Sequence, residues 1–107
     1  MKWRKVASAS ELAPGEMKRV LVAGCDVALC NLRGEFFAID NVCTHAFALL
    51  TDGYFEGDLL ECPLHGGRFD VRSGRAGGGI VTEDVRRYAV RVEGDDVLLS
   101  LGEGDEG

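Results

Sequence analysis

Apolar and polar residues alternate in several short runs along this chain. In the clearest run, over 85–92, Val85, Tyr88, Val90 and Val92 are apolar, and Arg87 and Arg91 fall on the face opposite Tyr88, Val90 and Val92. Alternation with a period of two residues indicates a β-strand with one buried face. Long helical periodicity is absent from the sequence, and only a short turn around 8–12 departs from the β pattern.

Turn residues separate these runs at three places. Pro14-Gly15 precedes an apolar stretch, Arg33-Gly34 joins the two halves of "DVALCNLRGEFFAID", and Gly94-Asp95 leads into the apolar run 97–101. Apolar runs joined by two such residues are typical of β-hairpins. We therefore predict an all-β fold made of short antiparallel strands.

Length and charge narrow the class of protein. A chain of 107 residues with 46% apolar and 28% charged residues fits one soluble globular domain. We expect that single domain to span 1–107, with a frayed acidic tail at about 102–107. The net charge of −6 argues against binding nucleic-acid phosphates. The sequence shows neither an apolar run of the roughly 18 residues that a membrane span needs nor a secretory signal, so we expect no membrane association and a cytoplasmic location.

Thiols and imidazoles gather in the stretch "CTHAFALLTDGYFEGDLLECPLHGG". Cys43 and His45 stand one residue apart, and Cys62 and His65 follow after sixteen further residues. Both histidines of the chain belong to this group. A disulfide scaffold belongs to oxidising compartments and needs no histidine. Structural zinc stays open, since two cysteines and two histidines can close a tetrahedral site, although the usual pattern places the cysteine pair before the histidine pair. The pattern predicts metal binding.

The spacing Cys-x-His-x16-Cys-x2-His, with its surroundings "CTH" and "CPLHGGRFD", resembles that of Rieske proteins. The likeness continues through "VALCNLRGEFFAIDNVCTH" and "VRRYAVRVEGDDVLLSL" and so covers nearly the whole chain. Among Rieske proteins, the chain is most similar to the small ferredoxins of bacterial ring-hydroxylating dioxygenase systems. The resemblance implies stacked antiparallel sheets, with a small cluster-binding subdomain of two loops inserted at about 41–80.

The resemblance also implies one [2Fe-2S] cluster. Cys43 and Cys62 would bind the inner iron, while His45 and His65 would bind the outer iron nearer solvent. Because neutral imidazoles add no charge, such a cluster accepts an electron more readily than one with four thiolates, and its potential is higher. The glycines that follow the second histidine, Gly66 and Gly67, would let backbone amides approach the sulfides closely.

The implied role is that of an electron carrier with no catalytic residues of its own. Its partners would be a flavin-dependent ferredoxin reductase and a Rieske non-haem iron oxygenase, and the carrier itself would be a monomer. An oxygenase catalytic subunit is excluded, because its iron centre needs two further histidines and a carboxylate. Two alternatives stay open: the small Rieske-like subunit of an assimilatory nitrite reductase, and a zinc-stabilised binding module.

Other residues of note have plainer interpretations. Cys25 and Cys30 are expected to be ordinary residues of the β-structure. Three aromatic residues are expected to cover the cluster loops: Phe47, Tyr54 and Phe55. Three arginines suggest a local basic patch on a turn: Arg68, Arg72 and Arg75. Rieske proteins often cover the cluster with a third, proline-containing loop, whereas this chain has glycines at 77–79, which suggests a more mobile cover or a different covering segment.

The first prediction concerns the reduction potential. High-potential respiratory Rieske proteins brace their loops with a disulfide, but Phe47 and Leu64 stand at those positions. They also direct a serine and a tyrosine hydroxyl at sulfur, where this chain has Gly67 and Phe69. Hydrogen bonds to sulfur stabilise the reduced cluster, so we expect a potential of about −150 mV rather than about +300 mV. Gly67→Ser and Phe69→Tyr should each raise it. A clearly positive wild-type potential in voltammetry would refute this account.

Overall fold

A computed structural model describes residues 3–42, 48–63, 67–78 and 84–100. Within these ranges the elements are short strands and two single 3-10 turns, in the following order: β1 (Arg4–Ser8), η1 (Ala9–Glu11), β2 (Met17–Val22), β3 (Cys25–Leu32), β4 (Glu35–Asp40), η2 (Leu50–Asp52), β5 (Tyr54–Glu56), β6 (Leu59–Glu61), β7 (Arg68–Asp70), β8 (Ala76–Gly78), β9 (Arg87–Glu93) and β10 (Asp96–Ser100).

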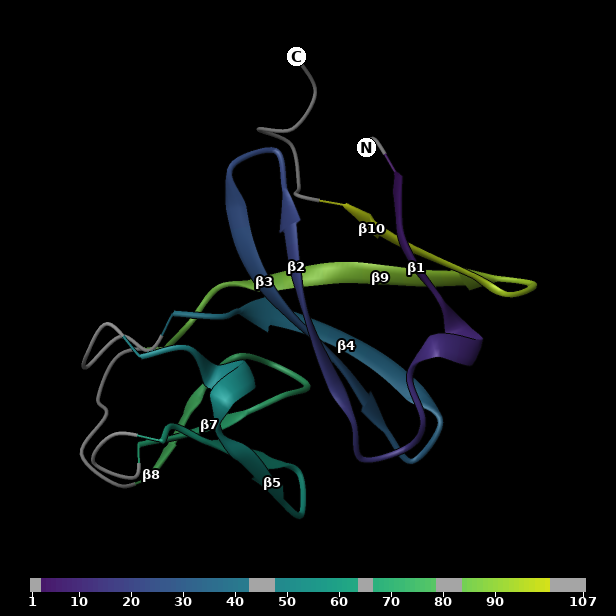
Figure 1. Cartoon of the computed structure of the whole chain (residues 1–107). Helices are drawn as coiled ribbons and strands as arrows, with labels where there is room; N and C mark the ends of the chain where they lie inside the picture. The colour runs from purple at the N-terminus through teal and green to yellow at the C-terminus, as the bar shows by residue number, and fades with distance from the viewer. Residues whose placement is uncertain (1–2, 43–47, 64–66, 79–83, 101–107) are drawn as a thin grey trace.

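The strands form two antiparallel sheets (Figure 1). The large sheet has the order β1-β10-β9-β4-β3-β2, and the small sheet has the order β5-β6-β7-β8. The predicted all-β, antiparallel fold is confirmed. The chain leaves the large sheet after β4, builds the small sheet, and returns as β9 beside β4. The small sheet is therefore an insertion between two neighbouring strands, and its strands fall inside the predicted range 41–80.

Two tight turns set the register of β2, β3 and β4. Arg33 and Gly34 have φ angles of 53° and 96°, and Ala23 and Gly24 have φ angles of 47° and 81°. Positive φ at both central residues is what a type I′ hairpin turn requires. The hairpin predicted at 33–34 is confirmed, and the β2–β3 turn is built in the same way.

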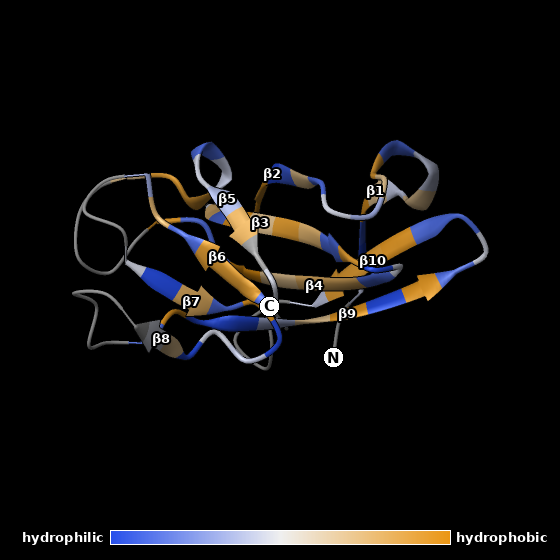
Figure 2. Ribbon diagram, turned by 90° about the horizontal axis from the view of Figure 1, so that it is seen from below, coloured by the Kyte–Doolittle hydropathy of each residue, from blue (hydrophilic) through white to orange (hydrophobic). Residues whose placement is uncertain are grey.

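Strand β3 is buried on both faces. Val27 and Leu29 belong to one hydrophobic core, while Ala28, Cys30 and Leu32 belong to another. Because successive side chains of a strand point to opposite faces, β3 lies between the two cores. In Figure 2 the hydrophobic colour is strongest within the strands, and the β9–β10 hairpin end is hydrophilic.

The first core fills the space between the two sheets. The large sheet contributes Ile39 from β4 besides the β3 residues, and the small sheet and its flanks contribute Leu60, Phe69 and Val71. The second core lines the other side of the large sheet and is made of Ala7, Leu12, Val20, Val27, Leu29, Ala38, Tyr88, Val97 and Leu99. The small sheet is thus held to the large one by apolar packing.

The alternation predicted for β9 holds only near β4. Tyr88 is buried opposite Ala38, and Val90 packs against the second core. Val92, which the pattern places on the same apolar face, is 45% exposed. Strand β9 pairs with β4 only at Tyr88 and Arg87, so Val92, near the β9–β10 turn, is paired with Val97 of β10 on one side and with no described strand residue on the β4 side.

The two ends of the insertion meet at Asp40 and Arg86. The Asp40 N–H donates to the Arg86 carbonyl (2.9 Å), and the Arg86 N–H donates to the Asp40 carboxylate (3.2 Å). The Tyr88 hydroxyl donates to the same carboxylate. Burial first, and then this hydrogen bond, raises the pKa of Tyr88, so its hydroxyl stays protonated as the donor.

Candidate metal centre

The stem of the second predicted ligand loop is closed by Cys62. Its N–H donates to the Gly67 carbonyl (2.6 Å). This bond extends the pairing of β6 with β7 by one position beyond the pair Glu61 and Arg68. Cys62 is 1% exposed and belongs to the core between the sheets. One predicted ligand is therefore a buried cysteine directly after the end of β6. Its predicted partner His65, and Gly66, lie outside the described residues.

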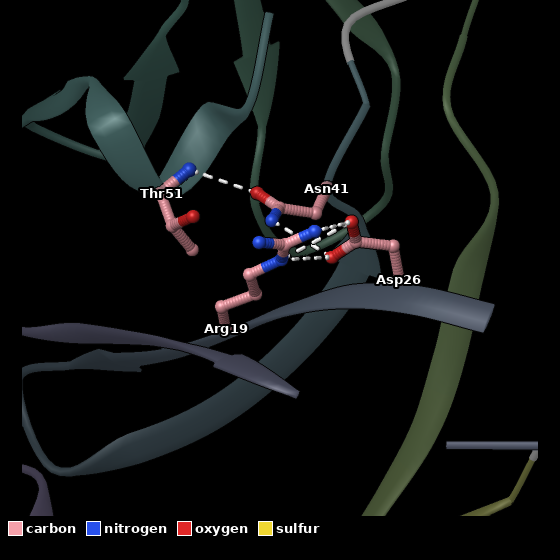
Figure 3. A network of polar contacts seen from close by, with 4 residues as sticks. All are labelled: Arg19, Asp26, Asn41 and Thr51. Atoms are coloured by element: carbon pink, nitrogen blue, oxygen red, sulfur yellow. Dashed lines mark hydrogen bonds and ion pairs between the residues drawn. The ribbon is translucent and has the colours of Figure 1, made fainter. Parts of the chain in front are cut away.

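The stem of the first predicted loop is closed in a similar way. Val42 and Leu49 form an antiparallel bridge, and the Leu50 N–H donates to the Asn41 carbonyl (2.6 Å). The side chain of Asn41 accepts a second hydrogen bond from the Thr51 N–H (2.8 Å; Figure 3). The residues between the two sides of this stem, 43–47, lie outside the described residues; they include Cys43, His45 and Phe47.

A third stem borders residues 79–83, which also lie outside the described part. The Asp84 carboxylate accepts a hydrogen bond from the Ala76 N–H (2.8 Å), and the Val85 N–H donates to the Gly74 carbonyl (2.8 Å). At Gly77 a Cβ atom would lie 2.7 Å from a methyl group of Leu59. That methyl group is the end of a flexible side chain, and the mobility suggested for 77–79 stays a prediction, because Gly79 lies outside the described residues.

All three stems meet in the core between the sheets. Ala48 and Leu50 follow the first loop, Cys62 begins the second, and Val85 follows the third segment; all four are buried in that core. Phe69 is fully buried there too. The fold thus gathers segments that are up to about forty positions apart in the sequence, and it does so with apolar side chains that exclude water.

These stems fit a [2Fe-2S] cluster in their donor chemistry. Thiolate and imidazole donors are those of Rieske centres, and the described donor, Cys62, is buried, as is Gly67, to which its backbone is hydrogen-bonded. Cys43, His45 and His65 lie outside the described residues, so the ligand set stays a prediction. Within the described ranges, no group of three or more His, Cys, Asp or Glu side chains could hold a metal.

The remaining described cysteines have a structural role. Cys30 is fully buried, and burial raises the pKa of its thiol to about 12. A thiol with so high a pKa is a poor nucleophile and metal ligand at neutral pH. Cys25 lies at the start of β3, partly buried against the second core. Cys25, Cys30 and Cys62 form no disulfide with one another.

A row of polar side chains crosses the outer face of the small sheet next to Cys62. Tyr54, Glu61 and Arg68 occupy paired positions on β5, β6 and β7. The Tyr54 hydroxyl donates to the Glu61 carboxylate, and Arg68 Nε donates to its other oxygen (3.1 Å). These two contacts, in that order of size, hold the pKa of Glu61 below its usual value. Tyr54, at the β5 end of this row, is 55% exposed. Phe55, the next residue, packs against the core between the sheets.

The arginines that suggested a basic patch are largely paired with carboxylates. Arg68 pairs with Glu61, and Arg72 lies 3.5 Å from Asp58 and over the ring of Phe37. Asp58 also pairs with Arg33 of the β3–β4 turn (2.8 Å). These carboxylates neutralise much of the local positive charge, so the interpretation as a basic patch does not hold for Arg68 and Arg72.

Comparison with known proteins identifies the family. The model of the Rieske [2Fe-2S] domain matches residues 2–99. The chain is 43% identical to the ferredoxin component of a naphthalene 1,2-dioxygenase system from Pseudomonas aeruginosa, over 94% of this chain and 96% of that protein. The chain belongs to the Rieske [2Fe-2S] family. Membership confirms the predicted resemblance and implies one [2Fe-2S] cluster in an electron-transfer protein rather than a catalytic enzyme.

Solved Rieske ferredoxins share the fold. The ferredoxin of carbazole 1,9a-dioxygenase from Nocardioides aromaticivorans superposes with a TM-score of 0.89 and 36% identity, covering 94% of this chain and 98% of its own. A second match, with a TM-score of 0.87 and 34% identity and covering 92% of each chain, comes from a complex of reduced oxygenase and oxidised ferredoxin in carbazole 1,9a-dioxygenase. Neither described 3-10 turn of the present chain is long enough to cross a membrane.

Some residues that shape this site escaped the sequence analysis. Asn41, Gly53 and Asp84 hold the stems, yet each looks like an ordinary turn residue in the sequence. The available signal was position: Asn41 stands two residues before a predicted ligand, and Gly53 lies between the two motifs. A Cβ atom on Gly53 would lie closer than 3.0 Å to the carbonyl oxygen of Glu61, the residue before Cys62.

We predict that Gly53→Ala destabilises the small sheet by about 3 kcal/mol, at the upper end of what overpacking usually costs. The new methyl group would push the Glu61 backbone, and with it Cys62, out of place. Gly57→Ala is the matched control, because Gly57 has a φ of 63° but open space around it, and should cost only about 1 kcal/mol. Chemical denaturation followed by circular dichroism measures both; equal losses would contradict the close-approach role of Gly53.

Proposed function

We propose that this chain is the ferredoxin component of a bacterial ring-hydroxylating dioxygenase system. It would carry single electrons from a flavin-dependent reductase to a Rieske non-haem iron oxygenase. The observation that carries the proposal is the whole-length match to ferredoxin components of such systems. A terminal oxygenase of carbazole 1,9a-dioxygenase also shares the fold, with a TM-score of 0.86 and 26% identity, and this chain covers 30% of it.

In this proposal, the cluster ligands are Cys43 and Cys62 on the inner iron and His45 and His65 on the outer iron. The bound cluster supplies a site that takes up and gives up one electron. Cys62 would hold its iron inside the apolar core, where water is excluded. Gly66 and Gly67 would bring backbone amides close to the sulfides, because a glycine leaves room where a side chain would intervene.

The setting of the carrier is part of the same proposal. We infer a monomer in the cytoplasm, with neither nucleic acid nor membrane as a partner. The net charge of −6 supports this, because an acidic protein is repelled by phosphates and can be steered toward basic docking surfaces. The oxygenase would contact the protein near its histidine ligands, which are the ligands proposed to lie nearest solvent.

The ligand assignment is tested by the metal content and the spectrum of the purified protein. We expect two irons and two acid-labile sulfides per chain and a red-brown oxidised form. His45→Ala and His65→Ala should each abolish the native spectrum, since each removes one of two ligands to the outer iron. One zinc and no labile sulfide would instead support the zinc-stabilised module, and an unchanged spectrum would remove that histidine from the ligand set.

The role as a mobile carrier is tested by reconstituting the electron-transfer chain. The protein expressed alone should keep its cluster, accept electrons from a flavin reductase and pass them to the oxygenase. Both rates should fall as salt is added, because salt screens the charges that steer the encounter. Isolation only as a stoichiometric complex with a large sirohaem enzyme would point to the nitrite reductase subunit.

A further inference from the structure

Asn41 is a buried amide whose polar groups are all engaged. Its side chain is 0% exposed. Its Oδ1 accepts a hydrogen bond from the Thr51 N–H (2.8 Å), and its Nδ2 donates to Asp26 Oδ1 (3.0 Å; Figure 3). The backbone repeats the pattern: the Asn41 N–H donates to the Asp26 carbonyl (3.0 Å), and its carbonyl accepts from the Leu50 N–H (2.6 Å). Asn41 therefore joins β3 on one side to η2 on the other.

The orientation of this amide is set by Asp26. Arg19 contacts the Asp26 carboxylate through Nε (3.1 and 3.2 Å) and through its terminal nitrogen (2.8 Å). The pKa of Asp26 is held below its usual value mainly by the hydrogen bond from Arg19 and, to a smaller extent, by that from Asn41. An ionised carboxylate only accepts hydrogen bonds. The donor end of Asn41 therefore faces Asp26, and its acceptor end faces η2.

The segment that Asn41 anchors links the stems of both predicted ligand loops. Val42, the next residue, bridges to Leu49 at the first stem, and Cys43 follows it in the sequence. At the other end of the same segment, Gly53 lies against the backbone of Glu61, which precedes Cys62. A shift of the Asn41 amide would thus reach both stems.

We propose that Asn41 is a positioning residue for the [2Fe-2S] cluster: its amide fixes the first loop stem between Asp26 of β3 and the backbone of η2. The inference rests on the proposed function, because it takes Cys43 and Cys62 as ligands. Replacing a residue that holds a metal ligand in position commonly lowers metal affinity 10- to 100-fold. In this proposal Asn41 does not bind iron; it positions the loop stem that precedes Cys43.

The chain offers a matched control in Asn31. This amide is also buried (4% exposed), and it also joins two backbone segments, donating to the Leu12 carbonyl (2.8 Å) and accepting from the Gly34 N–H (2.8 Å). It lies near the opposite end of β3 from Asp26, about 17 Å away at the rise of a strand. Replacing it disturbs the fold by a similar chemical change without touching the loop stems.

The experiment compares holo-protein carrying Asn41→Asp, Asn31→Asp, or Asn41→Asp together with Asp26→Asn. Asn41→Asp keeps the acceptor for Thr51 but sets two carboxylates against each other. The double variant exchanges the carboxylate and the amide, and so restores one donor and one acceptor between the two positions. Readouts are the rate of cluster release to a chelator, the electron paramagnetic resonance g values of the reduced cluster, and the melting temperature.

We expect Asn41→Asp to release its cluster about tenfold faster than wild type and to shift the g values, and the double variant to reverse both. Asn31→Asp should lower the melting temperature while the g values and the release rate stay near wild type. If Asn41→Asp yields no folded protein, the double variant decides alone, since it is expected to fold with wild-type g values.

Other outcomes overturn the proposal. Release and g values in Asn41→Asp equal to those of Asn31→Asp would show that Asn41 serves overall stability only. Failure of the double variant to restore the wild-type signal would show that a hydrogen bond between positions 26 and 41 is not sufficient to position the stem, which overturns its assignment to that hydrogen bond. The wild-type control separates the two levels of inference: a wild-type protein without any [2Fe-2S] signal would refute the proposed function, whereas a normal wild type with an unaffected Asn41→Asp refutes only the positioning role.

Discussion

Burial of both faces of β3 is the constraint on which the other parts of this molecule depend. Its side chains enter two different cores in alternation, from Val27 to Leu32. Each fully buried aliphatic side chain contributes about 1.5–3 kcal/mol, whereas an exposed ion pair contributes about 0.2–1 kcal/mol. Apolar packing on β3 therefore holds the two sheets together. The ion pair of Asp58 with Arg33 connects the small sheet to the β3–β4 turn of the large one but adds little to their attachment.

Polar groups fix the positions of the loop stems, which apolar packing alone does not determine. Apolar contacts are nondirectional, so the core between the sheets would accept small displacements of the loop stems. The hydrogen bonds of Asn41 remove that freedom, because a buried amide that loses a partner costs about 1–3 kcal/mol. The backbone bond between Cys62 and Gly67 acts similarly at the second stem. The site thus combines apolar attachment with directional polar contacts at each stem.

Much of the architecture could be predicted from the sequence, and so could the family. The Arg33-Gly34 and Gly94-Asp95 turns carry strong local signals, and the motif of two cysteines and two histidines has a specific spacing. The strands of the small sheet, such as β6 and β7, gave no such signal, because three residues are too few to show a period. Strand β3 was predicted as one half of a hairpin, but its burial on both faces depends on a second core that only the folded chain supplies.

The details of the site were harder to predict because their partners are distant in the sequence. Arg72 looked like part of a positive patch until the structure placed Asp58 beside it. Asn41 looked like a turn residue, since its contacts with Asp26 and Thr51 exist only after β3 and η2 have come together. Val92 has the alternation of a buried residue, but the pairing of β9 with β4 ends before it, and among the described strands Val92 is paired with β10 alone. In each case the sequence shows the local pattern but not the residue that lies beside it in the folded protein.

The meeting of Asp40 and Arg86 has a consequence for how such a protein can evolve. The segment inserted between β4 and β9 is a long connection, and its two ends, Asp40 and Arg86, are joined by a backbone hydrogen bond. The entropy cost of closing a loop grows only slowly with its length. Residues can be gained, lost or exchanged inside this connection while β4 and β9 keep their pairing. The inserted segment contains the predicted cluster ligands, so substitutions there can alter the predicted site while the pairing of β4 with β9 stays unchanged.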